Sequence, residues 1–374
     1  MDNTEIVNIT SLNYIGAKKT LLPYLNKVIS ETLESSDILC DLFAGSGIVG
    51  SYFRQKCKGV ISNDIELYSY VINRGLLTCD YTIKISDIIQ DINDRVLHED
   101  NLKPDISKDL IYKHFSPSPG CERMYFTCEN AVKIDRSRQE IERLHKDEII
   151  TLEEYHFLLG SILVSADKLA NTTSLYCAYL KAFKKSAIQT FILKPLHTLT
   201  KSSNTKLNKV FNMDAQSLAE EWLLGKEGFD ILKEVDVVYV DPPYCARQYG
   251  ANYSPLNYMV EYSDENELTG KTGILKDYFR SDFARKPNVK AAFSDIVKML
   301  QPKKAIFISY NSESLLSQEE MKNVFLKHGD VILYKKLYRR FKSNVQTDSK
   351  QVYELLYRID CRSKTNSYIE NEVL

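Results

Sequence analysis

The stretch DILCDLFAGSGIVG, residues 37–50, contains the pattern that decides the fold. Its first seven residues predict a buried strand, AGSG predicts a turn, and a helix is expected from Ile48 to Gly59. A second strand over 60–64 and a second helix over 65–77 follow. Strands that alternate with helices in this way predict an α/β fold with a parallel sheet.

Glycines at the turn suggest a ligand site. Gly45, Gly47 and Gly50 spell GxGxxG between a strand and a helix, where the backbone can approach a ligand and the helix presents free N–H groups. Asp64 closes the next strand, where a carboxylate can bind a ribose diol. NAD and S-adenosylmethionine both carry such a diol, so this motif leaves both ligands open.

The composition is that of an ordinary globular protein. The chain has 374 residues, 44% hydrophobic and 26% charged, with a net charge of −1, which fits one large or two moderate domains. It has no run of 18 apolar residues, and its first residues lack a signal-peptide pattern, so no membrane association is expected. Eight cysteines without a CxxC pair and six histidines without ligand spacing indicate a cytoplasmic protein with reduced cysteines and no metal site.

A mostly helical stretch separates two sheet-forming parts of the chain. Residues 135–148 predict a charged, exposed helix, and residues 151–173 carry a helical stripe of apolar side chains. The β-rich runs at 330–341 and 351–360 predict a terminal antiparallel hairpin. We therefore expect a discontinuous sheet domain over 1–78 and 205–374, and an inserted helical recognition region over 79–204.

A second motif lies in VVYVDPPYCARQY, residues 237–249, where a buried strand runs into Asp241. In open parallel sheets, ligands bind beyond the carboxyl ends of strands. The prolines hold the backbone so that the Pro242 carbonyl points outward beside the Asp241 carboxylate, and Tyr244 adds a flat face for stacking. Two acceptors and a ring suit the exocyclic amino group of an aromatic base, and hydride transfer needs none of them.

The two motifs resemble those of the amino-group DNA methyltransferases. The order of glycine loop, long insertion and DPPY, with YIGAK at 14–18 near the amino end, resembles the Dam-type (D12 class, alpha group) N6-adenine methyltransferases. That family has a Gly-Gly-Lys-like element where this chain has Gly-Ala-Lys. Further segments resemble family members, so the resemblance covers nearly the whole chain: 125–138, 171–181, 212–215, 307–313, 339–340 and 353–357. Residues 247–253 resemble type II modification methylases in particular.

The resemblance implies a Rossmann-like methyltransferase sheet that uses S-adenosylmethionine. It implies catalytic roles for Asp241, Pro242, Pro243 and Tyr244. The cofactor-binding residues that it implies are Tyr14, Gly16, Lys18, Asp41, Phe43, Gly45, Gly47, Asp64 and Asp214. Asp241 and the Pro242 carbonyl would accept the two N6 hydrogens of an adenine that has left the duplex and stacks on Tyr244.

Local basic stretches predict contact with double-stranded DNA. Residues 181–209 hold seven lysines and residues 335–342 five basic residues, with no acidic residue in either stretch. The expected phosphate-binding residues are Lys184, Lys185, Arg247, Arg339, Arg340 and Lys342. Base readers are expected in the insertion or in 343–350. The type II resemblance implies protection of DNA from a cognate restriction enzyme that acts separately, and we expect a monomer or weak dimer.

Several alternatives stay open at this point. N4-cytosine methylation also needs a pocket for an exocyclic amine, although Ser is frequent in those enzymes at the position of Asp241. Methylation of RNA or of a glutamine amide usually goes with Asn-Pro-Pro-Tyr. The glycine motif alone is also typical of an NAD-dependent oxidoreductase. A non-catalytic DNA-binding module is disfavoured by the intact DPPY.

Overall fold

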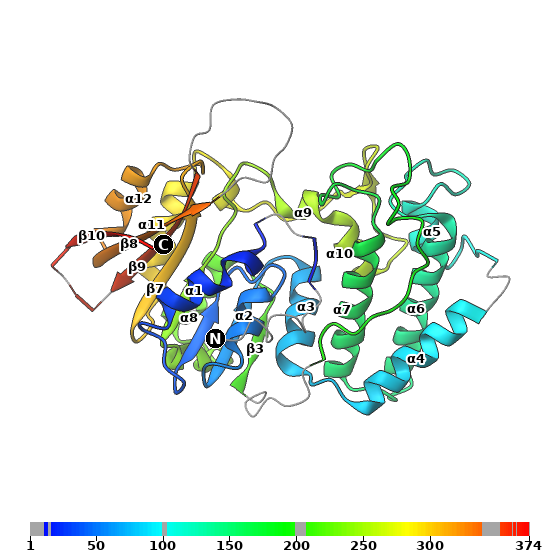
Figure 1. Cartoon of the computed structure of the whole chain (residues 1–374), viewed down its shortest axis with the longest axis horizontal. Helices are drawn as coiled ribbons and strands as arrows, with labels where there is room; N and C mark the ends of the chain where they lie inside the picture. The colour runs from blue at the N-terminus through cyan, green and yellow to red at the C-terminus, as the bar shows by residue number, and fades with distance from the viewer. Residues whose placement is uncertain are drawn as a thin grey trace.

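One eight-stranded sheet organises the protein in the computed structural model, which describes residues 11–13, 16–98, 103–198, 207–338, 352–360, 362–363 and 365–373 (Figure 1). The strands run across the sheet in the order β10 (Tyr368–Glu372), β8 (Asp330–Tyr338), β9 (Val352–Asp360), β7 (Ala305–Asn311), β4 (Val237–Val240), β1 (Ile38–Asp41), β2 (Gly59–Asn63) and β3 (Lys209–Phe211). The strands β3, β2, β1, β4 and β7 pair in parallel, and β9 pairs antiparallel with β7 and β8. The predicted Rossmann-like sheet with a C-terminal antiparallel hairpin is confirmed.

The chain order reverses between β1 and β4. From β1 the sheet continues to β2 and β3 on one side, and to β4 and β7 on the other. Such a switch point leaves a crevice beyond the carboxyl ends of the two central strands. The glycine loop follows β1 and the DPPY corner follows β4, so the topology brings both motifs to this crevice. The last strand, β10, pairs in parallel with β8 and was not predicted.

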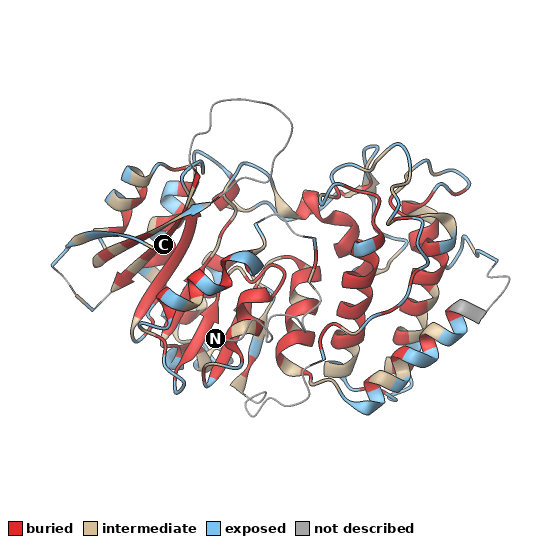
Figure 2. Cartoon of the chain, in the orientation of Figure 1, coloured by how far each residue is buried: buried red, intermediate tan, exposed pale blue. Residues whose placement is uncertain are grey.

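The central strands of the sheet are buried (Figure 2), because alternate side chains enter two separate cores, one on each face. Leu39 and Tyr239 pack into one core, and Cys40 and Val238 into the other. The first core takes in α1 (Leu22–Ile29), α2 (Ile48–Phe53) and α3 (Leu67–Thr78); the second takes in α8 (Ala215–Leu224), α11 (Val289–Met299) and α12 (Gln318–Phe325). Short 3₁₀ turns are η2 (Lys18–Leu21), η4 (Asp230–Glu234) and η5 (Asp282–Ala284).

A helical region lies beside the α3 end of the sheet (Figure 1). It contains α4 (Ile83–His98), α5 (Leu110–Phe115), α6 (Cys128–Lys146) and α7 (Leu152–Leu169), together with α9 (Tyr249–Asn252), α10 (Ser254–Glu261) and the small ribbon β5 (Leu268–Thr269) and β6 (Ile274–Leu275). Arg138 on α6 donates hydrogen bonds to the carbonyls of Met259 and Val260. The segment after DPPY therefore packs on the helical insertion. The insertion predicted from the sequence ends at residue 204 and does not include this segment. No helix in the described ranges is long and apolar enough to cross a membrane.

Two element predictions were wrong in detail. The helix after the glycine loop ends at Phe53, and Gly59 is the first residue of β2, where a Cβ would lie 3.1 Å from Leu207 Cβ. The helix predicted as exposed over 135–148 is part of the longer α6, and Asp135 and Arg138 are buried. Asp135 accepts hydrogen bonds from the backbone N–H groups of Ile111 and Tyr112 in the first turn of α5, which satisfies two of the free donors at that helix end.

Candidate active site

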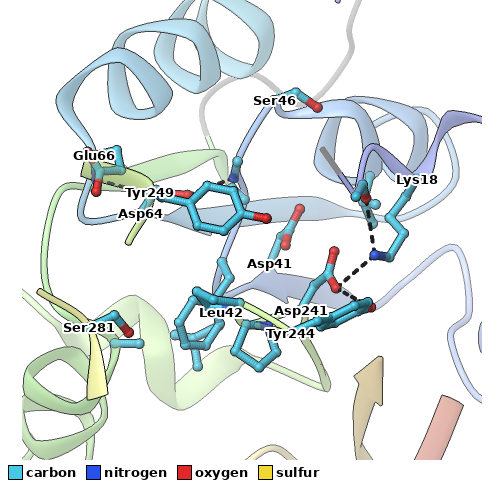
Figure 3. Close-up of a pocket in the computed structure, with 18 of the residues that line it drawn as sticks. Lys18, Asp41, Leu42, Ser46, Asp64, Glu66, Asp241, Tyr244, Tyr249 and Ser281 are labelled. Carbon is cyan, nitrogen blue, oxygen red and sulfur yellow. Dashed lines mark hydrogen bonds and ion pairs between the residues drawn. The ribbon is translucent and has the colours of Figure 1, made fainter. Parts of the chain in front are cut away.

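A cavity of about 400 Å³ lies at the carboxyl ends of the central strands (Figure 3). Its lining comes from five separate parts of the chain: residues 16–21, 41–49, 63–66, 213–215 and 239–249, with further contributions from 279–281, 311–313 and 352–354. The glycine loop and the DPPY corner, which are far apart in the sequence, therefore face one space. This volume is in the usual range for a small-molecule site.

The glycine loop is held in a shape that other residues could not adopt. Gly47 has φ +74°, and a Cβ on it would lie 2.5 Å from Leu76 Cδ1. The Gly45 N–H donates to Asp64 Oδ2 at 2.7 Å, and the Gly45 carbonyl accepts from Ser69 Oγ at 2.6 Å. The loop backbone is thus fixed at the cavity wall by contacts with β2 and α3.

Asp41, at the end of β1, is a carboxylate with spare hydrogen-bonding capacity. It is 1% exposed, and its Oδ2 accepts from the Gly50 N–H at 3.2 Å. Its Oδ1 has no hydrogen-bond partner in the described part of the chain. Burial raises the pKa of Asp41 to about 8, the nearby Asp241 adds to this effect, and the Gly50 N–H opposes it. A buried acceptor without a donor, at a cavity wall, suits a cationic ligand.

The DPPY corner carries a charged network (Figure 3). Asp241 Oδ1 lies 2.9 Å from Lys18 Nζ and accepts from the Tyr244 hydroxyl at 2.7 Å. Burial raises the pKa of Asp241, while Lys18 and Tyr244 lower it. Burial also works against the Lys18 cation, but Asp241 and Glu354 outweigh it and raise the pKa of Lys18. Lys18 is predicted to bind the cofactor; in the structure it lines the cavity and its ammonium contacts Asp241.

Two members of this network were missed in the sequence. Glu354 on β9 is 5% exposed, and its Oε1 accepts from Tyr244 at 2.9 Å and from Ser309 Oγ on β7 at 3.0 Å. Lys18 Nζ lies 3.5 Å from the same oxygen. The only sequence signal for Glu354 is its place in the otherwise apolar and aromatic run VYELLY at 352–357. Ser309 gives no signal.

Acidic side chains line the opposite part of the cavity. Both oxygens of Asp64 are engaged, since Oδ1 accepts from the Glu66 N–H at 2.9 Å and Oδ2 from the Gly45 N–H. Glu66, which was not predicted, accepts from Asn257 at 2.7 Å, and burial raises its pKa to about 8. Asp214 lines the cavity and caps α8 through the N–H groups of residues 216 and 217.

Aromatic rings complete the walls. Phe43 lies edge-to-face against Phe283, with ring centroids 5.1 Å apart. Tyr249 projects into the cavity between Asp64 and Asp241 (Figure 3), and its hydroxyl lies 3.8 Å from the position of a Cβ on Gly16. These rings offer flat apolar faces, which suits a ligand that contains an aromatic base.

The predicted DNA-binding residues have different surroundings. Arg247, just after DPPY, and Lys185 are exposed. Lys184 is half-buried, and its ammonium donates to the Thr172 carbonyl at 2.7 Å. The remaining predictions, Tyr14, Arg339, Arg340, Lys342 and the base-reading stretch 343–350, lie outside the described residues.

Comparison with known proteins connects this site to one family. Residues 14–324 match the family model of D12 class N6 adenine-specific DNA methyltransferases. The chain is 38% identical to type II methyltransferase M.NlaIII of Neisseria lactamica over 337 residues, covering 89% of this chain and 93% of that protein. It is 37% identical to type II methyltransferase M.CviAII of Paramecium bursaria Chlorella virus 1, covering 92% and 97%. It is 32% identical to type II methyltransferase M.FokI of Planomicrobium okeanokoites, covering 96% of this chain and 57% of that protein.

Proposed function

Because the chain belongs to the D12 class of N6 adenine-specific DNA methyltransferases, we propose that it transfers the methyl group of S-adenosylmethionine to adenine N6 within a specific double-stranded DNA sequence. Membership of this family favours the reaction over the alternatives of N4-cytosine methylation and NAD-dependent oxidoreduction. One observation carries the proposal: the glycine loop and the DPPY corner line the same cavity. That cavity has room for a cofactor and a base edge to meet.

The residues present fit S-adenosylmethionine, which supplies a methyl group from a positively charged sulfonium. S-adenosylmethionine also carries an ammonium group, which can donate hydrogen bonds. Asp41 Oδ1 could accept one of them, because it has no hydrogen-bond partner among the described residues. Glu66 and Asp64 lie where carboxylates can bind the ribose hydroxyls, with Asp214 and Phe43 nearby for the adenine. Gly16 and Gly45 bring the backbone to the same cavity, and Gly47 packs behind the loop against Leu76.

Asp241 would orient the target amino group. The lone pair of adenine N6 is delocalised into the ring, so the enzyme must position this nitrogen and polarise it. Asp241 and the Pro242 carbonyl would accept its two hydrogens, and Pro243 would keep the corner rigid. Burial raises the pKa of Asp241 and Lys18 opposes this effect, so the ammonium 2.9 Å away favours the ionised side chain that accepts hydrogen bonds.

The base must leave the duplex to reach Asp241, since N6 is otherwise paired inside the helix. Stacking on Tyr244 would return about 1–3 kcal/mol of the cost. The Lys18 ammonium lies 4.6 Å from the centroid of the Tyr244 ring, over one face. A base that stacks on Tyr244 would therefore lie close to this cation.

Charged residues outside the cavity would hold the DNA backbone. Arg247 and Lys185 are exposed and available for phosphate contacts, and Arg339, Arg340 and Lys342 are proposed for the same role from the sequence. Sequence reading would fall to the helical region and to residues 343–350. By analogy with its type II relatives, the enzyme would protect DNA from a cognate restriction endonuclease that acts separately.

A transfer assay tests the proposal. The protein is incubated with tritium-labelled S-adenosylmethionine and unmethylated DNA, and the DNA is digested to nucleosides. We expect the label in N6-methyladenine, and none on the same DNA after complete methylation with unlabelled cofactor. Label in N4-methylcytosine, or no transfer to any DNA tested, would contradict the proposal.

A further inference from the structure

Glu354 is a buried carboxylate that the catalytic motifs do not explain. It projects from β9, near the hairpin end, and is 5% exposed. Burying a carboxylate is costly unless donors surround it. Three donors do so here, from three other parts of the chain: Tyr244 after β4, Ser309 on β7, and Lys18 on η2.

The donors around Glu354 and Asp241 cannot satisfy every short contact at once. Burial raises the pKa of Tyr244 well above its usual range, so its hydroxyl keeps its single hydrogen. That hydroxyl lies 2.7 Å from Asp241 Oδ1 and 2.9 Å from Glu354 Oε1. It can donate to only one of these carboxylates at a time.

The hydroxyl of Ser309 allows Tyr244 to donate to either carboxylate. Its Oγ lies 2.8 Å from the Tyr244 oxygen and 3.0 Å from Glu354 Oε1. When Tyr244 donates to Asp241, Ser309 can donate to Glu354. When Tyr244 donates to Glu354, Ser309 can donate to the Tyr244 oxygen. Both carboxylates keep a donor in the first arrangement, and Asp241 gains a vacant acceptor position in the second.

We propose that Glu354 is a positioning residue that receives the Tyr244 hydroxyl when Asp241 accepts the amino group of the target base. This inference rests on the proposed function. Asp241 Oδ1 is crowded, since it is within reach of both Lys18 and Tyr244. When the Tyr244 hydroxyl rotates and donates to Glu354 in place of Asp241, that oxygen becomes free for an N6 hydrogen and no buried group is left unpaired. It also holds the Tyr244 ring by its hydroxyl while the base stacks on the ring.

Steady-state kinetics of Glu354→Gln test this role. The amide keeps the shape of the side chain but is a weaker acceptor, so Asp241 stays bonded to Tyr244. We expect kcat to fall roughly 10- to 100-fold, the range for one hydrogen bond to a charged group. The KM for DNA and the affinity for S-adenosylmethionine should be unchanged. Asp360→Asn, on the same strand outside the cavity lining, is the matched control and should keep wild-type kcat.

A double-mutant cycle with Tyr244→Phe gives the sharper test. The phenyl ring can still stack on the base but has no hydroxyl to donate to Glu354, so the substitution at Glu354 should then have no further effect on kcat. We expect Tyr244→Phe with Glu354→Gln to be no slower than the slower single variant. Rate losses that multiply would show that the two residues act independently and would overturn the proposal.

Two further outcomes separate the inference from the proposed function. An active wild type with an equally active Glu354→Gln removes only this inference, whereas a wild type that methylates no adenine removes the proposed function. If Glu354→Gln does not fold, as judged by thermal melting, Tyr244→Phe alone decides. Its kcat should fall about 10-fold, because Glu354 can no longer hold the ring by its hydroxyl, while 2-aminopurine fluorescence at the target position stays at the wild-type level. An unchanged kcat in Tyr244→Phe overturns the inference.

Discussion

Lys18 lies between two carboxylates, Asp241 and Glu354, at distances of 2.9 and 3.5 Å from its ammonium. With Asp41 at the same cavity, buried acids outnumber the buried cation. Such an excess raises the pKa of the acids and favours the binding of a cation at the cavity. S-adenosylmethionine carries a positive sulfonium and an ammonium, so the charges of the site complement the proposed cofactor.

Asp241→Asn tests the proposed catalytic carboxylate. The amide keeps the shape, but its oxygen is a weaker acceptor and its NH2 group can only donate, so we expect methyl transfer to fall by about 10²- to 10³-fold. Binding of S-adenosylmethionine, measured by titration calorimetry, should change little, because Asp41 and the glycine loop are untouched. A near wild-type rate would reduce Asp241 to a turn residue.

Tyr244→Ala is the matched comparison for that variant. It removes the stacking ring, so a flipped base should lose about 1–3 kcal/mol. The fluorescence of 2-aminopurine at the target position should therefore fall in Tyr244→Ala and persist in Asp241→Asn. An equal loss in both variants would argue against separate roles in stacking and in hydrogen bonding.

The buried Asp41 predicts a pH dependence of stability. Its folded-state pKa of about 8 lies above the usual value of 3.8, so the folded protein holds a proton that the unfolded chain releases. Stability should therefore fall as the pH rises between these values, by at most ~1.4 kcal/mol per pH unit from this group. Asp41→Asn cannot ionise, and urea unfolding at pH 6 and pH 8 should show a smaller loss for it than for wild type. Identical losses in the two proteins would contradict the raised pKa.

At the residue scale, the sequence predicts groups whose chemistry is local. Asp241 and Tyr244 belong to one contiguous motif, and the structure places both at the cavity. Glu354 and Ser309 could not be predicted, because their role depends on the pairing of β9 with β7. The sequence predicted that Lys18 belongs to the site but not which residues it contacts, since a motif does not say which carboxylate an ammonium will pair with.

At the scale of elements, the glycine loop shows how packing fixes a functional backbone. The sequence predicted the strand, the turn and the helix, because apolar periodicity and glycine spacing are local signals. It did not predict where α2 ends. Gly59 is the first residue of β2, and a local pattern does not report the long-range strand pairing that sets this position. The terminal strand β10 was missed because only two of its five residues, Tyr368 and Ile369, are apolar or aromatic and it is largely exposed.

Gly47→Ala separates backbone strain from steric conflict. Positive φ costs a non-glycine residue about 1–2 kcal/mol, and a Cβ 2.5 Å from Leu76 Cδ1 adds about 1–3 kcal/mol of overpacking. Gly228→Ala is the matched control, because Gly228 has φ +89° but no atom within 4 Å of its Cβ position. Urea unfolding should show a clearly larger loss for Gly47→Ala, together with weaker binding of S-adenosylmethionine. Equal losses would mean that Leu76 moves aside without cost.

At the scale of the whole molecule, the helical region is joined to the catalytic corner by the segment after DPPY. Tyr262 donates to Asp135 at 2.6 Å, and Arg138 holds the carbonyls of Met259 and Val260. The sequence predicted an insertion over 79–204, but it could not show that residues 249–275 pack on it, because that contact is long-range. This link places the helical region beside the cavity, as a DNA-reading part of the proposed enzyme requires.

Arg247 tests how the molecule as a whole would hold DNA. It is exposed in the loop that joins DPPY to this helical link, and the next residue, Gln248, lines the cavity. If it contacts a phosphate, Arg247→Ala should weaken binding to all DNA sequences about equally. It should also reduce the slope of log K against log salt by about one unit.

Arg362→Ala, near the C-terminus and paired with Asp360, is the matched control with the same charge change and should keep the wild-type slope. A loss confined to one sequence would make Arg247 a base reader, because phosphate contacts carry no sequence information. An unchanged slope would leave Arg247 a solvated side chain and move the DNA path away from this edge of the cavity.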